Sequence, residues 1–335
     1  MRKGICVAGN MIVDILYPTE GWPKRGELVH ILDGISRSTG GAVCNVIVDL
    51  AKLDPQLPLF AMGKIGEDAE GDVILKKLGE HANIDVSNVI REGISAFTAV
   101  MNDVKSNERT FFTYLGANGR FDEDCIDWNS ISANIFHIGY ILLLNALDQP
   151  DTEYGSKMAR LLHHAQQHGL KTSIDVVSEA SDRFTQLVPP ALKYTDYCII
   201  NEVEAQQTTG ILLRDENGGL MIDNMPKALA AMKAMGVSTW AVIHCPEGGY
   251  GLDEQDHYVQ LSSLKLPEGY IKGTVGAGDA FCAGVLYGAE KGRTLAQAID
   301  LGIASAAASL SQPGSTEGMR PETEVLKLFD AFGRR

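Results

Sequence analysis

Residues Gly273-Thr-Val-Gly-Ala-Gly-Asp279 run directly into Ala280-Phe-Cys-Ala-Gly-Val-Leu-Tyr287, so that a glycine-rich turn opens an apolar helix. Three glycines remove side chains from this turn, and consecutive backbone N–H groups can therefore converge on one point. The dipole of the helix adds positive potential at the same point. The stretch predicts an anion-binding site at the start of the helix.

Asp279 places a carboxylate at the rim of this site, where negative charge is expected to bind. Such a residue is useful there if it handles a proton. A carboxylate beside an anion hole can take the proton of an alcohol while the N–H donors hold the group that the alcohol attacks. The alternative, an aspartate that only caps the helix after a glycine turn, stays open at this point.

Short apolar strands alternate with amphipathic helices along most of the chain. The expected strands are Ile5–Gly9, Leu59–Lys64, Ile135–Ile138, Thr172–Asp175, Tyr197–Asn201 and Thr239–His244. The expected helices are Gly41–Leu53, Ala69–His81, Gly155–His168, Gln186–Lys193, Pro226–Met235, Asp279–Lys291, Leu295–Leu310 and Glu322–Phe332. Strands separated by helices imply right-handed crossovers. The pattern predicts an α/β fold with a mostly parallel sheet and helices on both faces.

Two stretches interrupt this alternation, Leu16–Ser38 and Ile94–Leu115, and neither has a helical period. We expect them to pair into a small β-sheet that stands over the main domain as a lid. Residues 1–15, 39–93 and 116–335 then form the α/β core, and residues 16–38 and 94–115 form the lid. Two unrelated surface hairpins are the alternative.

The composition is that of an ordinary globular protein, with 335 residues, 45% hydrophobic and 21% charged. The net charge of −14 disfavours binding to nucleic acid, whose phosphates are bound mainly by lysine and arginine. No apolar run approaches the ~20 residues that span a bilayer, and we expect no membrane association and a cytoplasmic protein. Six scattered cysteines without a C-x-x-C pair predict buried free thiols.

A second glycine pair, in Thr39-Gly-Gly-Ala-Val-Cys-Asn45, leads into a helix. Paired glycines let a ligand approach the backbone closely, and the amide of Asn45 could bind a polyol. Asp14 follows the first strand, at the end where open α/β sheets bind ligands, and its carboxylate could accept two hydrogen bonds from a diol. A capping asparagine and an exposed loop acid are the respective alternatives.

Two further segments follow strands in the second half of the chain. Asn201-Glu-Val-Glu204 could hold a hydrated Mg²⁺ through Glu204, or could be a plain capping box. Glu247-Gly-Gly-Tyr-Gly251 could face a nucleotide, although a simple hairpin turn is the favoured interpretation.

In their order along the chain, these segments resemble the ribokinase-like (PfkB) carbohydrate kinase family. The resemblance covers residues 5 to about 315, and Gly-Ala-Gly-Asp279 is its most specific part. It implies a doubly wound α/β domain with a β-sheet lid. It also implies transfer of the γ-phosphoryl of ATP, with Mg²⁺, to a hydroxyl of a sugar or nucleoside.

The resemblance assigns a role to each matched position. Asp279 corresponds to the catalytic base. The remaining positions are Gly276, Ala277 and Gly278 for the anion hole; Asp14, Gly40, Gly41 and Asn45 for the sugar; Asn201 and Glu204 for magnesium and the phosphates, with Glu204 acting through water; and Thr274 and Gly249 for the nucleotide.

Some positions depart from the family pattern. Gly273 stands where an aspartate usually helps to bind a monovalent cation, which leaves potassium dependence open. His244 and Pro246 stand where threonine and glycine are usual, Asp175-Val-Val replaces Asp-Pro-Asn, and Ile303 stands near an often polar position beside the adenine. The residues assigned to phosphoryl transfer are retained.

The leading hypothesis is therefore an ATP- and Mg²⁺-dependent kinase that phosphorylates a primary hydroxyl of a small sugar or sugar acid. A nucleoside kinase and a non-catalytic sensor of sugar or nucleotide are the alternatives. Because a lid has exposed strand edges, and such lids often pair in this family, we also expect a homodimer.

Overall fold

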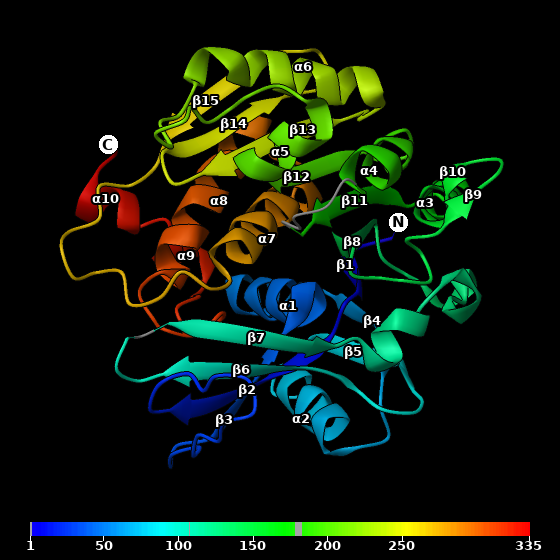
Figure 1. Ribbon diagram of the computed structural model, residues 1–335. Helices are drawn as coiled ribbons and strands as arrows, with labels where there is room; N and C mark the ends of the chain where they lie inside the picture. Colours follow the sequence, from blue (N-terminus) through cyan, green and yellow to red (C-terminus); the bar gives the residue numbers. More distant parts are fainter. Residues whose placement is uncertain (1, 107, 178–182) are drawn as a thin grey trace.

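A nine-stranded sheet runs through the upper and middle part of the molecule (Figure 1). The computed structural model describes residues 2–106, 108–177 and 183–335. The strand order is β15-β14-β13-β12-β11-β8-β1-β4-β5, and only β14 and β15 run antiparallel to their neighbours. The strands are β1 (Ile5–Gly9), β4 (Leu59–Ile65), β5 (Ile84–Arg91), β8 (Ile135–Ile141), β11 (Lys171–Val176), β12 (Tyr197–Asn201), β13 (Trp240–Cys245), β14 (Gly248–Leu252) and β15 (Tyr258–Ser262).

Helices cover both faces of this sheet because successive strand side chains point to opposite sides. In β1, Ile5 and Val7 enter one hydrophobic core, and Cys6 and Ala8 enter the other. On the first face lie α1 (Gly41–Leu53), α2 (Ala69–Leu78), α7 (Ala277–Glu290) and α8 (Leu295–Ser309). On the second face lie α3 (Lys157–Gln167), α4 (Phe184–Leu192), α5 (Glu202–Thr209) and α6 (Met225–Met235). The doubly wound α/β fold is confirmed.

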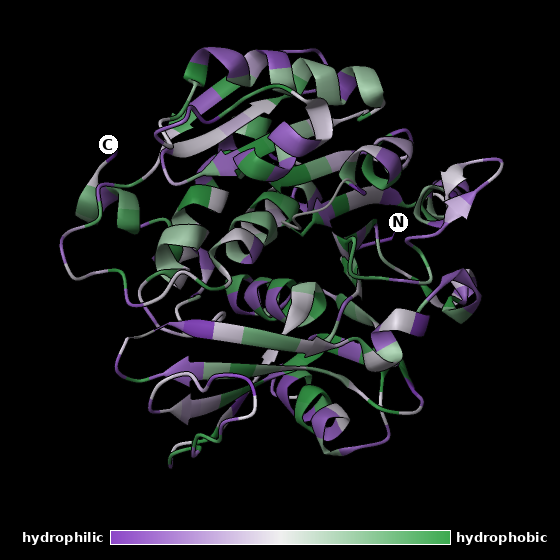
Figure 2. Cartoon of the chain, viewed as in Figure 1, coloured by the Kyte–Doolittle hydropathy of each residue, from purple (hydrophilic) through white to green (hydrophobic). Residues whose placement is uncertain are grey.

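Hydropathy follows this layering. Figure 2 shows hydrophobic residues along the strands of the main sheet and mixed helices such as α6 at the outside. All six cysteines are free, and four of them are buried. Within the described ranges, no helix has the length and hydrophobicity that crossing a membrane requires.

The two stretches that interrupt the α/β pattern meet in a separate four-stranded sheet, seen at the bottom of Figure 1. Its order is β3-β2-β6-β7, formed by β2 (Ile12–Thr19), β3 (Ser36–Gly40), β6 (Ala96–Asp103) and β7 (Arg109–Tyr114). Strands β2 and β6 pair in parallel along their whole length. The expected boundary at residue 16 differs from the structure, because β2 begins at Ile12 and carries Asp14 into the small sheet.

Several element boundaries differ from the expected ones for local reasons. The helix expected from Gly155 begins at Lys157, because Gly155 pairs in the hairpin of β9 (Pro150–Asp151) and β10 (Gly155–Ser156) and the Ser156 side chain caps the helix. The expected C-terminal helix is divided into α9 (Glu322–Val325) and α10 (Leu328–Phe332).

The position of β1 predicts where ligands bind. Its neighbours are β4 on one side and β8 on the other, so the chain winds outward in two directions from this point. In open α/β sheets, the crevice at such a switch point opens at the carboxyl ends of the strands.

Candidate active site

Four neighbouring parallel strands deliver polar side chains to one cavity at this edge of the sheet. Tyr140 lies near the end of β8, Asp175 near the end of β11, Asn201 at the end of β12 and His244 near the end of β13. These four residues, together with Glu204, the start of α7 and two valines, line a cavity of 250 Å³. Their meeting follows directly from the parallel sheet, in which carboxyl ends share an edge.

Asp279 faces this cavity from the opposite side, as the third residue of α7. Its side chain does not cap the helix, whose N-cap is Gly276 with a left-handed φ of 78°. Instead, Asn45 Nδ2 donates to Oδ2 at 2.9 Å, and the Tyr140 hydroxyl donates to Oδ1 at 3.1 Å and Oδ2 at 3.0 Å. Asp279 therefore does not cap the helix, which was the alternative interpretation of this residue.

Burial sets the acidity of Asp279. The residue is 5% exposed, and the loss of solvation raises its pKa to about 6, although hydrogen bonds from Asn45 and Tyr140 act in the opposite direction. Burial and the nearby carboxylates raise the pKa of Tyr140 well above its usual value, so this phenol remains a donor. The arrangement keeps a carboxylate that can exchange a proton near neutral pH.

Glycines shape the turn that precedes Asp279. A Cβ on Gly276 would lie 2.4 Å from the Ser315 carbonyl oxygen, and its left-handed backbone also requires glycine. A Cβ on Gly278 would lie 3.3 Å from the His244 imidazole, which lines the same cavity. The first N–H groups of a helix have no acceptor within the helix, so the start of α7 presents donors suited to an anion. The N–H of Ala277 also donates to the Thr274 carbonyl, at 3.4 Å.

Of the residues expected to bind a sugar, Asn45 contacts this carboxylate, but Asp14, Gly40, Gly41 and Asn45 are not on the wall of the 250 Å³ cavity. Asn45, in the first turns of α1, contacts Asp279 directly and accepts a hydrogen bond from the Ser315 hydroxyl at 2.8 Å. Asp14 lies on β2, and a Cβ on Gly40 would be only 2.7 Å from its Oδ2 atom. Burial raises the pKa of Asp14, and a hydrogen bond with Thr98 on β6 opposes this change.

Position 41 requires a glycine for structural reasons. Its φ is +86°, and a Cβ would lie 2.4 Å from the Asn10 side chain. The glycine pair thus allows the small sheet to pass directly into α1, which sets Asn45 and Asp14 at the same end of the molecule.

Three carboxylates share the cavity, those of Asp175, Glu204 and Asp279. Burial, followed by the charges of Glu204 and Asp279, raises the pKa of Asp175 well above its usual value. Asn201 and Glu204 also form a capping box, since each side chain accepts a backbone N–H of the other residue. The plain capping role therefore exists together with the position on the cavity wall. Among the described residues, no three acidic, histidine or cysteine side chains lie close enough to bind a metal directly.

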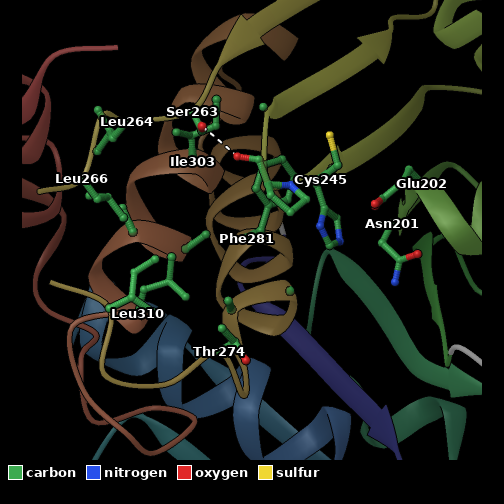
Figure 3. A pocket seen from close by; sticks show the side chains of 18 of the residues that line it. Asn201, Glu202, Cys245, Ser263, Leu264, Leu266, Thr274, Phe281, Ile303 and Leu310 are labelled. Carbon is green, nitrogen blue, oxygen red and sulfur yellow. Dashed lines mark hydrogen bonds between the residues drawn. The ribbon is translucent and has the colours of Figure 1, made fainter. Parts of the chain in front are cut away.

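A second cavity, of 410 Å³, adjoins the first, and Asn201, His244 and Gly278 line both. Figure 3 shows Leu264, Leu266, Ile303 and Leu310 gathered at one end of it, with Asn201 and Glu202 at the other. Such a cavity accepts a flat apolar group at one end and directs a polar group towards the start of α7. Thr274 lies on its wall.

Gly249 occupies a different place from the one expected. It lies within β14, where a Cβ would be 2.5 Å from Ile299 and 3.1 Å from Phe281, and the neighbouring Gly248 lines the cavity instead. The favoured interpretation, a hairpin turn over this segment, holds only in part: the turn is Pro246-Glu247, and Gly248 to Gly251 belong to β14, which pairs with β13.

Sequence reasoning did not identify Tyr140, which contacts the central carboxylate. Its signal was a polar aromatic residue two positions after an expected strand. Asp175 and His244 were noticed as departures from a family pattern, without a role. The ring of His244 packs on Phe281 with centroids 4.8 Å apart, and burial lowers its pKa to about 4.

Comparisons with known proteins agree with this architecture. Ribokinase of Arabidopsis thaliana is 22% identical over 328 residues, covering 97% of this chain and 80% of that protein. Its structure, complexed with ribose and ATP, has a TM-score of 0.80 and covers 98% of this chain and 99% of that one. 5-Dehydro-2-deoxygluconokinase of Bacillus velezensis is 24% identical, covering 88% of this chain and 86% of that protein. Adenosine kinase of Schizosaccharomyces pombe is 24% identical, covering 80% of this chain and 78% of that protein.

The family model described as pfkB family carbohydrate kinase matches residues 2–322. This match includes the small sheet, the 250 Å³ cavity and the glycine turn before Asp279. The chain belongs to the pfkB family of carbohydrate kinases.

Proposed function

We propose that this protein is an ATP-dependent kinase that transfers the γ-phosphoryl group to a hydroxyl of a small sugar or sugar acid, with Asp279 as general base. The supporting observation is the placement of Asp279, which is hydrogen-bonded to Asn45 and lines a cavity that adjoins the 410 Å³ pocket. A base, an acceptor-binding amide and a pocket for a flat apolar group are the parts that this reaction needs.

The hydrogen bonds of Asp279 indicate which oxygen acts. Oδ2 accepts from both Asn45 and Tyr140, whereas Oδ1 accepts only from Tyr140. Oδ1 therefore has the greater remaining capacity to accept the proton of the acceptor hydroxyl. The freed oxygen forms a bond to the γ-phosphorus, and the bond from this phosphorus to the β,γ-bridging oxygen breaks and leaves ADP. The N–H groups of residues 276–278 stabilise the charge of the phosphoryl group during transfer.

The 410 Å³ pocket suits ATP. The adenine would lie against the apolar side chains of Ile303, Leu310 and Leu264, and the phosphates would extend past Thr274 to Gly278. His244 stands where the two cavities meet, close to the path of the phosphate chain.

The carboxylates of the first cavity fit Mg²⁺. Buried like charges are unfavourable, as the raised pKa of Asp175 indicates, and a divalent cation would compensate them. Asp175 and Glu204 would hold the ion through water. Bound Mg²⁺ would supply charge neutralisation for the phosphates.

The alternatives remain a nucleoside kinase of the same fold and a non-catalytic sensor. Product analysis with sugars and nucleosides separates the two kinases. A buried carboxylate with a pKa of about 6 favours catalysis over sensing, because a protein that only binds needs no such base.

We also propose that the small sheet is a lid and that it forms a homodimer. Of the fifteen large hydrophobic residues that are exposed within the described ranges, four lie in residues 16–38 and five in residues 94–115. Trp22 and Phe112 stack on this surface with ring centroids 6.1 Å apart. Exposed apolar patches and free strand edges are typical of association surfaces.

The test of the proposed function is ATP turnover with a panel of sugars, sugar acids and nucleosides. Asp279→Asn removes the base but keeps the size of the side chain, and we expect kcat to fall at least about 100-fold with little change in acceptor binding. Asp223→Asn, an exposed residue outside both cavities, changes the charge equally and is expected to retain full activity. Near-normal turnover by Asp279→Asn would show that the assignment of the base is wrong.

A further inference from the structure

We infer that Arg335 binds the phosphate chain of the nucleotide, together with the N–H groups at the start of α7. This inference rests on the proposed kinase function and names a binding residue in the segment that follows α10. The side chain of Arg335 lines the 410 Å³ pocket. Among the described residues on the wall of that pocket, it is the one lysine or arginine.

Main-chain bonds hold the segment after α10 beside this pocket. Leu264 and Arg334 pair as an isolated antiparallel bridge. The Arg335 N–H donates to the Ser263 carbonyl at 2.9 Å. Successive side chains of an extended segment point to opposite sides. The Arg334 guanidinium accordingly donates to Asp300, whereas the Arg335 side chain lies on the pocket wall. The backbone pairing therefore determines which of the two arginines can meet a ligand.

The guanidinium of Arg335 is available to a ligand. The side chain is exposed, and within the described ranges it forms no ion pair. Its Nη1 donates to the Pro246 carbonyl over a long 3.4 Å, which uses one of the five N–H groups of a guanidinium. The remaining donors can bind an anion that enters the pocket.

The carboxylate on the same wall is already compensated. Glu202, the first residue of α5, accepts hydrogen bonds from Nε and Nη2 of Arg214 at 3.0 and 2.6 Å. Arg214 also donates to Glu247, which is not on the wall of the pocket. His244 adds no charge near neutral pH, because burial lowers its pKa to about 4. Within the described part of this wall, Arg335 is therefore the charged side chain without an opposite charge.

The place of Arg335 along the pocket favours the phosphates over the base. In Figure 3, Leu264 marks the apolar end of the pocket and Asn201 the polar end. Between these ends the Ser263 hydroxyl donates to the Pro246 carbonyl at 2.8 Å, and Arg335 donates to the same oxygen. A nucleotide with its base at the apolar end would bring its first phosphates past this point on the way to α7. Pro246 has no N–H group to offer them, and Arg335 supplies donors at this turn.

The first experiment measures binding of ADP with Mg²⁺ by titration calorimetry at low ionic strength, where contacts between exposed charges are least screened. Arg335→Gln keeps a polar side chain and removes the charge, and we expect it to bind ADP about 10-fold more weakly than the wild type. Arg335→Lys keeps the charge and should recover most of this loss. Unchanged affinity in Arg335→Gln, or a lysine variant as weak as the glutamine variant, would overturn the inference.

Arg334→Gln is the matched control. It removes the same charge from the neighbouring position, whose side chain is directed to Asp300 and not into the pocket. Its affinity for ADP should stay within about 2-fold of the wild type, because the contact with the phosphates is kept. An equal loss in Arg334→Gln would show that net charge, and not a contact of Arg335, weakens binding.

Kinetics separate this inference from the kinase function. With an accepted substrate, Arg335→Gln should raise KM for ATP about 10-fold and change kcat and KM for the acceptor much less, since the contact holds the nucleotide before and during transfer. If the wild type binds ADP but phosphorylates no acceptor, the kinase function fails, and the calorimetric comparison still decides the inference. If the wild type does not bind ADP, both are wrong.

Discussion

Asp279 combines two requirements that oppose each other at the scale of a single residue. Its burial favours the protonated form, and the donors Asn45 and Tyr140 favour the ionised form, so that its pKa lies at about 6. Tyr140 reaches this carboxylate from a backbone with φ of 63°, which is uncommon for any residue other than glycine and costs on the order of 1 kcal/mol. The strain is compensated by the surrounding strands, and it aims the phenol at the base.

The pH dependence of the reaction follows from this balance. A base must be ionised, and we expect kcat/KM to fall as the pH decreases through about 6. Tyr140→Phe removes a donor that stabilises the ionised form, so the pKa of Asp279 should rise and the acidic limb of the profile should move to higher pH. A pH–rate profile measures this shift.

Tyr258→Phe removes a phenolic hydroxyl on β15, whose partner is Gln260, and serves as the control. Its profile should match that of the wild type. If Tyr140→Phe lowered the rate equally at all pH values, the phenol would have only a structural role.

At the scale of elements, the start of α7 depends on two glycines with different tasks. Gly276 needs its left-handed backbone and its close approach to Ser315, whereas Gly278 has an ordinary helical position beside the two cavities. Both glycines line the 250 Å³ cavity, but only Gly276 is also required by its backbone conformation and packing in the folded state.

Alanine substitutions should distinguish these tasks. Gly276→Ala is expected to lower the free energy of unfolding by about 1–3 kcal/mol, because both strain and a clash arise. Gly278→Ala should keep most of the stability but place a methyl group between His244 and the phosphate path. We expect a rise in KM for ATP or a fall in kcat of about 10-fold. Thermal or denaturant unfolding together with steady-state kinetics measures both, and equal loss of stability in the two variants would contradict this division.

At the scale of the whole molecule, the small sheet and its connecting segments place exposed apolar side chains at one end of the molecule. Phe111 is 62% exposed on β7, one of the two edge strands of that sheet. Such a surface is unfavourable in water unless another surface covers it.

Sedimentation should therefore detect a species of twice the 36.2 kDa of one chain. Phe111→Lys places a charge on the proposed interface and is expected to shift the protein to the monomer without lowering its melting temperature much. A wild-type protein that sediments only as the monomer at micromolar concentration would disprove the dimer.

The sequence by itself determined the local features. Period and composition predicted most strands and helices within a few residues, because hydrophobic alternation and helical spacing are properties of neighbouring residues. The glycine turn before Asp279 was also recognisable from neighbouring residues, because glycine permits a backbone conformation that other residues avoid. Resemblance to a family then connected Asn45 with Asp279, which are 234 residues apart.

Tertiary structure alone decided which side chains meet. Tyr140 and Asp175 join Asp279 because the carboxyl ends of β8 and β11 share an edge of the sheet, and the order of the strands is not encoded in any short segment. Asp14 lies in the small sheet because β2 pairs with β6, more than 80 residues along the chain. Gly249 serves packing against α8 because of the same long-range assembly. Contacts between distant segments depend on the packing of whole layers, and local sequence patterns carry no information about that packing.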